Sequence, residues 1–79
     1  MDSIAFYETS DIVLAAVLKT QGYKLHEIKL NGNKGIFKFL NVPKQLLIDF
    51  DTGALQVEPV NFNNSIKSLT TAVRRLPRG

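Results

Sequence analysis

The last twenty residues carry an apolar stripe that fixes one element of the fold. Apolar side chains recur there at alternating spacings of four and three residues: Phe62, Ile66, Leu69, Val73 and Leu76. This spacing predicts an amphipathic helix whose apolar residues cover an arc of about 80°. Lys67 and Arg74 fall on the opposite side, with Arg75 near them. One narrow edge of the helix must therefore pack against a partner, most simply the rest of the domain.

A second helix is predicted between residues 9 and 22. A hydroxyl of Thr9 or Ser10 can cap free backbone N–H groups, and the carboxylate of Asp11 favours the positive end of a helix dipole. Gly22 can end the helix in a left-handed conformation. Residues 12–18 are apolar almost all round, so we expect this helix to be central and covered on more than one side.

A β-hairpin is predicted next. Residues 23–25 and 28–30 alternate in opposite phase, which a bulge near His26 and Glu27 would reconcile. Residues 31–35 are rich in turn formers, and residues 36–40 read as the second strand. We expect Phe37 and Phe39 to point inward, because the opposite phase would bury Lys38 without a partner.

The chain after the hairpin reads as helix, strand and final helix. Asn41 is a candidate cap for a short helix that has Pro43 in its first turn and ends at Gly53. Three of its side chains are expected to point inward: Leu46, Leu47 and Phe50. Residues 55–57 alternate as a short third strand. Pro59 begins the final helix and Pro77 helps to end it.

These elements predict one α+β domain over residues 1–79, in the order α-β-β-α-β-α, with residues 1–8 and 77–79 as its flexible ends. A compact three-stranded sheet with the helices mainly on one face would bury each apolar face. The third strand could pair parallel to the second strand or antiparallel to the first, and the sequence leaves this open.

The composition is that of a globular domain, with 44% hydrophobic and 22% charged residues, and it excludes a disordered chain. Because cysteine is absent, neither a disulfide nor a thiolate metal site is possible, and we expect a cytoplasmic protein. The longest apolar run is too short to span a bilayer, and Met1-Asp2 lacks the basic start of a secretory signal, so no membrane partner is expected.

The order of motifs resembles a small prokaryotic family catalogued only as a domain of unknown function. The residues that carry the resemblance are Thr9-Ser10-Asp11, Leu14-Ala15-Ala16, Leu18, Gly22-Tyr23-Lys24-Leu25, Phe37-Lys38-Phe39, Asp49-Phe50, Gly53, Val57-Glu58-Pro59, Phe62 and Ile66-Lys67-Ser68-Leu69. The resemblance covers nearly the whole chain and implies a compact domain of about this length, without an assigned activity. The basic tail 74–78 departs from the family pattern.

Three short motifs have structural explanations that we favour over functional ones. Residues 51–53 resemble the active-site turn of retroviral-type aspartic proteases, but the only later glycine, where a second loop would be needed, is Gly79. Residues 32–35 fit the GXXG loop of a KH domain, which joins two helices rather than two strands. Lys34-Gly35 resembles the start of an RRM strand, yet Ile36 and Lys38 occupy its exposed aromatic positions.

No set of side chains points to catalysis or to a metal. His26 is the only histidine, and zinc would have to recruit scattered carboxylates such as Glu27, so we expect a surface or bulge histidine. Asp49 and Asp51 would diverge by about 200° on a helix and cannot act as an acid–base pair. We therefore expect no enzyme, no catalytic residue, no metal and no cofactor.

The basic residues suggest a function in nucleic-acid binding. The net charge is +3, and four cationic residues lie in the last thirteen positions: Lys67, Arg74, Arg75 and Arg78. We expect a non-enzymatic accessory module that contacts phosphates weakly and without reading sequence. The simpler interpretation is a solvated helix face with cations near the negative end of its dipole, and four charges do not decide between the two.

The alternative function is protein–protein interaction or self-assembly, through surplus apolar surface on the first helix or the open face of the hairpin. In a phage or mobile element such a module would fit an inhibitor of another protein. The excess of basic over acidic residues argues against a protein that mimics DNA with acidic side chains.

Overall fold

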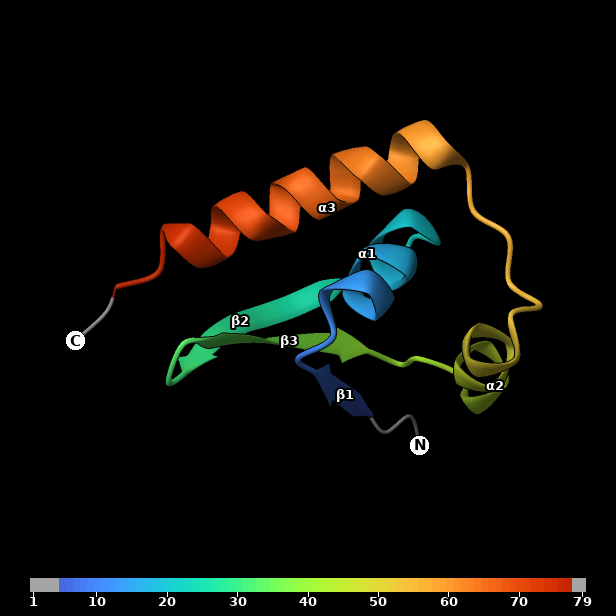
Figure 1. Cartoon of the computed structure of the whole chain (residues 1–79). Helices are drawn as coiled ribbons and strands as arrows, with labels where there is room; N and C mark the ends of the chain where they lie inside the picture. Colours follow the sequence, from blue (N-terminus) through green and yellow to red (C-terminus); the bar gives the residue numbers. More distant parts are fainter. Residues whose placement is uncertain (1–4, 78–79) are drawn as a thin grey trace.

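The computed structural model describes residues 5–77, which form a three-stranded sheet and three helices (Figure 1). The elements are β1 (Phe6–Thr9), α1 (Ile12–Thr20), β2 (Leu25–Asn31), β3 (Lys34–Leu40), α2 (Lys44–Thr52) and α3 (Pro59–Arg74). The predicted single α+β domain is confirmed. The predicted element order is wrong, because the chain runs β-α-β-β-α-α.

The third strand of the sheet precedes α1 instead of following α2. β1 pairs antiparallel with β3, and the strand order is β1-β3-β2. Since β1 and β2 occupy both edges of β3, residues 54–58 cross to α3 without regular structure. Two alternating apolar residues between Gly53 and Pro59 are too few to form a strand of their own. Phe6–Thr9 is thus a strand where a flexible end was expected, and residues 1–4 lie outside the described range.

The hairpin forms as predicted. Gly32 and Asn33 make a two-residue turn between Asn31 and Lys34, and Gly32 has a φ of 65°, which suits the first position of a type II′ turn. The register shifts between Leu25 and Glu27, so the predicted bulge is confirmed. Phe37 and Phe39 are 2% and 0% exposed and point into the core.

α1 and α3 lie on the same side of the sheet in Figure 1. The N-terminus of α1 is capped by Asp11, whose carboxylate accepts hydrogen bonds from the N–H groups of Val13 and Leu14. Five consecutive α1 residues, 14–18, are buried, which confirms a central helix. The buried side chains of α1, β3, α2 and α3 form one core: Leu14, Ala15, Ala16, Leu18, Phe37, Phe39, Leu46 and Leu69.

α3 carries the predicted apolar stripe. Leu69 is 1% exposed, and three further stripe residues pack against the core: Phe62, Ile66 and Val73. Pro59 is the first helical residue, after Glu58, whose carboxylate accepts from the Asn61 N–H at 2.6 Å. Leu76 lies beyond the helix end. A close approach of Gly35 to Val73 brings the last turns of α3 over the hairpin.

The start of α2 differs from the prediction. Pro43, not Asn41, is the N-cap residue, and no side chain caps this end. Asn41 instead adopts a left-handed φ of 54° and exchanges hydrogen bonds with Ala5: its Oδ1 accepts from the Ala5 N–H at 3.0 Å, and its own N–H donates to the Ala5 carbonyl at 2.8 Å. Asn41 therefore ties the chain before β1 to the end of β3. Leu46, Leu47 and Phe50 point toward the core as predicted.

Candidate nucleic-acid interface

The outer face of α3 presents exposed cations on the side opposite the apolar stripe. Lys67 and Arg74 are both exposed and stand seven residues apart, which places them on one face about 10 Å from each other along the axis. Arg75 is exposed and follows directly as the C-cap residue. Arg78, the fourth predicted site residue, lies outside the described residues.

No carboxylate balances these cations locally. The sequence contains no Asp or Glu after Glu58. The residues three and four positions on either side of Lys67 are Asn63, Asn64, Thr70 and Thr71. Among residues 5–77, every ion pair joins Lys29 or Lys38 to Glu8 or Glu27, far from α3 in the sequence. Within residues 5–77, the charges on α3 therefore face solvent without salt bridges.

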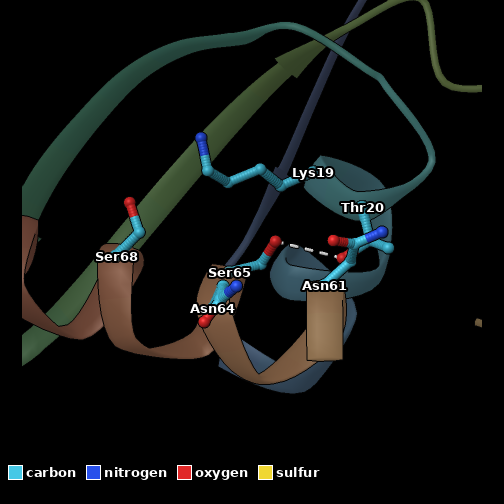
Figure 2. A pocket seen from close by; sticks show the side chains of 6 residues that line it. All are labelled: Lys19, Thr20, Asn61, Asn64, Ser65 and Ser68. Carbon is cyan, nitrogen blue, oxygen red and sulfur yellow. Dashed lines mark hydrogen bonds between the residues drawn. The ribbon is translucent and has the colours of Figure 1, made fainter. Parts of the chain in front are cut away.

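A polar hollow of about 390 Å³ lies between the end of α1 and the first half of α3 (Figure 2). Its lining comprises Lys19 and Thr20 of α1 together with Asn61, Asn64, Ser65 and Ser68 of α3. The hydroxyl groups of Thr20 and Ser65 are hydrogen-bonded at 3.0 Å, and Ser65 is buried. We did not predict this hollow. The available clue was the row of polar residues at positions 61, 64, 65 and 68, which share one side of a helix.

The outer face of the sheet carries a different arrangement of charge. Lys38 Nζ lies 3.5 Å from a Glu8 carboxylate oxygen and 3.6 Å from one of Glu27, and Lys29 Nζ lies 3.3 Å from Glu8. The hydrogen bond from Lys29, together with the charges of Lys29 and Lys38, holds the pKa of Glu8 below its ordinary value. Two cations and two anions thus compensate each other on this face.

An aromatic pair accompanies these charges. The rings of Phe6 and His26 have centroids 5.1 Å apart, and Lys38 Nζ lies 4.9 Å from the centroid of Phe6. His26 is exposed at the bulge, as predicted. Because Phe37 and Phe39 are buried, this face lacks the exposed aromatic row of an RRM strand.

The protease-like motif is a helix end. Asp51 is exposed in the last turn of α2, and Gly53 follows with a φ of 77°. The N–H groups of Gly53 and Ala54 donate to the carbonyls of Phe50 and Asp49. This confirms the interpretation of Gly53 as the left-handed residue that closes α2.

Over residues 5–77, no helix is both long and apolar enough to cross a membrane, and no group of three His, Asp or Glu side chains could hold a metal ion. Compared with protein-family models, curated proteins and solved structures, the chain matches none of them. The resemblance to a small prokaryotic family therefore stays a prediction.

Proposed function

We propose that this protein is a non-enzymatic module that binds nucleic acid weakly and without sequence preference through the outer face of α3. The supporting observation is that Lys67, Arg74 and Arg75 are exposed, form no ion pair within the described chain, and lie on a helix without a single acidic residue. Such cations contact phosphates, which lowers the net charge of both partners and releases counterions. A cytoplasmic location, expected because cysteine is absent, belongs to the same proposal.

The helix dipole explains only part of this charge pattern. Arg74 and Arg75 lie at the C-terminus of α3, where cations are stabilised by the dipole. Lys67 lies about two turns earlier, and the dipole effect falls off within the last turn. An exposed helix would ordinarily pair such a lysine with a carboxylate three or four residues away, and none is present here. Lys67 is therefore the residue that favours a binding role over a solvated helix end.

The dimensions of α3 suit a strand of phosphates. Its sixteen residues span about 24 Å, which equals the axial rise of about seven phosphates on one strand of a duplex. Three cations on this length would make about three phosphate contacts, so we expect a log–log salt slope of about −3 and micromolar or weaker affinity near physiological salt.

Fluorescence anisotropy with labelled single- and double-stranded oligonucleotides at low salt tests the proposal. We expect binding to both, and a salt slope near −1 for the variant that combines Lys67→Gln, Arg74→Gln and Arg75→Gln. Circular dichroism should show an unchanged fold, because all three side chains are exposed. Absence of binding by the unmodified protein would overturn the proposal, as would full binding by the variant.

Protein interaction or self-assembly, including inhibition of another protein in a phage or mobile-element setting, is the second candidate. Exposed apolar side chains favour it, and they include Phe6, Val13, Ile48 and Val60 at 45–63% exposure. They belong to β1, α1, α2 and α3 respectively, and scattered apolar residues of this kind are common on monomers. A mass that rises with concentration in sedimentation equilibrium would favour this candidate, and a constant monomer mass would contradict self-assembly.

A further inference from the structure

We infer that the hollow between α1 and α3 receives one backbone phosphate of the bound nucleic acid. The bound strand would then run from the hollow along α3 to Arg75. This inference rests on the proposed function and adds a second helix, through Lys19 and Thr20, to the interface.

The lining of the hollow has the chemistry of an anion site. It offers the ammonium of Lys19, the carboxamides of Asn61 and Asn64, and the hydroxyl groups of Thr20, Ser65 and Ser68. None of these side chains is a carboxylate, so no lining side chain carries a negative charge that would repel an anion. In Figure 2 the Lys19 side chain extends from the end of α1 in the direction in which α3 runs from Asn61 to Ser68.

The hydroxyl pair leaves a donor available. Thr20 Oγ1 and Ser65 Oγ are 3.0 Å apart, and one of the two hydroxyls donates to the other. Two hydroxyls carry two hydrogens, so the acceptor of this bond still has one O–H group to give. An anion next to the two hydroxyl groups can accept a hydrogen bond from this O–H group, while the existing hydrogen bond holds both oxygens in place. Phosphate oxygens are strong acceptors and suit a hollow that offers several hydrogen-bond donors.

The hollow is continuous with the cations of α3. Ser68 and Arg75 stand seven residues apart, which places them on one side of the helix about 10 Å from each other along the axis. Asn64 stands three residues before Lys67, so this lysine borders the side of the helix that lines the hollow. A strand that leaves the hollow therefore passes Lys67 and reaches Arg75 two turns after Ser68. Lys19, Lys67 and Arg75 would serve successive parts of one backbone.

Paired variants can isolate the hollow from the rest of the surface. The hollow variant combines Lys19→Gln with Asn64→Ala. The control combines Lys44→Gln with Asn63→Ala, which makes the same chemical changes at exposed positions outside the hollow. We expect the hollow variant to bind an oligothymidylate about fivefold more weakly, with a salt slope reduced by about 0.7, and the control to match the unmodified protein.

A nitrogen-15 NMR titration identifies the source of the phosphate. With the oligothymidylate we expect the side-chain amides of Asn61 and Asn64 to shift, while Asn63 changes less. Inorganic phosphate at the same phosphate concentration should shift them less, because it lacks the adjoining contacts to Lys67 and Arg75. Shifts at Asn61 and Asn64 with inorganic phosphate but not with the oligonucleotide would overturn the inference in favour of a small phosphorylated ligand.

The two proposals fail in different ways. In one outcome, the hollow variant binds the oligonucleotide as tightly as its control, while the variant with Gln at positions 67, 74 and 75 loses binding. The inference about the hollow is then wrong and the proposed function stands. If the unmodified protein binds no oligonucleotide at all, the proposed function is wrong and the inference falls with it.

Discussion

The outer face of the sheet and the outer face of α3 both display cations, but among residues 5–77 only the sheet holds cations in ion pairs. Lys29 and Lys38 lie within 3.6 Å of Glu8 or Glu27, so the charges of these four residues sum to zero. Lys67, Arg74 and Arg75 have no acidic neighbour on their helix. The difference shows that the net charge of +3 is less informative than its distribution, because cations gathered on one helix without a carboxylate attract a strand of phosphates more than cations that are paired or scattered.

Both faces depend on the same core, and substitution of Phe39 in that core is expected to have the largest effect on stability. Phe39 is 0% exposed and lies in the same buried core as the α1 residues Leu14 and Leu18. We expect Phe39→Ala to lower the free energy of unfolding by about 3–5 kcal/mol, which would remove most of the stability of a domain this small. Urea denaturation checks this, and an unchanged midpoint would show that the inward phase of β3 is wrong.

Gly35 controls how the last turns of α3 sit over the hairpin. A Cβ added at Gly35 would lie 2.7 Å from Val73 Cγ2, which is too close for an unshifted helix. We expect Gly35→Ala to cost about 1–3 kcal/mol by overpacking, and to displace the helix segment that carries Arg74. Chemical denaturation measures the loss. The matched variant Val73→Ala in the Gly35→Ala background should recover part of it, and no recovery would contradict a clash at this contact.

Removal of the carboxylates on the outer face of the sheet should turn this face into a second surface that binds nucleic acid. In a variant that combines Glu8→Gln and Glu27→Gln, Lys29 and Lys38 lose their partners. We expect nucleic-acid affinity to rise several-fold and the salt slope to become steeper by about one to two units. A salt slope equal to that of the unmodified protein would show that ion pairing does not explain why the two faces differ in nucleic-acid binding.

The smallest expected effect is the pH dependence contributed by Glu8. The pKa of Glu8 is lowered in the folded state, mainly by the hydrogen bond from Lys29, so its contribution to stability is present above the ordinary glutamate value of 4.5 and is lost as the pH falls through the lowered pKa. Because Glu8 is exposed, the loss should be slight. Comparison of acid unfolding for the unmodified protein and Glu8→Gln checks the sign, and a variant that is more acid-sensitive would contradict it.

Local patterns predicted most of the elements. The apolar stripe of α3, the bulge at His26, the inward phase of Phe37 and Phe39 and the left-handed Gly53 all follow from periodicity or turn chemistry within a few residues. The third strand did not follow, because β1 is defined by pairing with β3 about thirty residues later. The aromatic and β-branched composition of Phe6–Thr9 was the available clue.

The role of Asn41 and the hollow could not be predicted from local sequence either, because both depend on contacts between segments that are distant in the chain. Asn41 has the chemistry of a helix cap, but its side chain accepts a hydrogen bond from the N–H of Ala5, which precedes the neighbouring strand β1. The helical repeat predicted that Lys67 and Arg74 are exposed. It could not predict the hollow, because the hollow forms only where α1 and α3 bring Thr20 and Ser65 together.

A comparison of two variants with equal net charge tests the central claim most directly. One carries Lys67→Gln, Arg74→Gln and Arg75→Gln, and the other carries Lys24→Gln, Lys34→Gln and Lys44→Gln, three exposed lysines outside the ion pairs. Each loses three positive charges from +3, which leaves a net charge of 0. If the distribution of charge decides binding, the first variant should show a salt slope near −1 and the second should keep a slope of about −3. Equal slopes in the two variants would contradict the account, because they would show that only net charge matters.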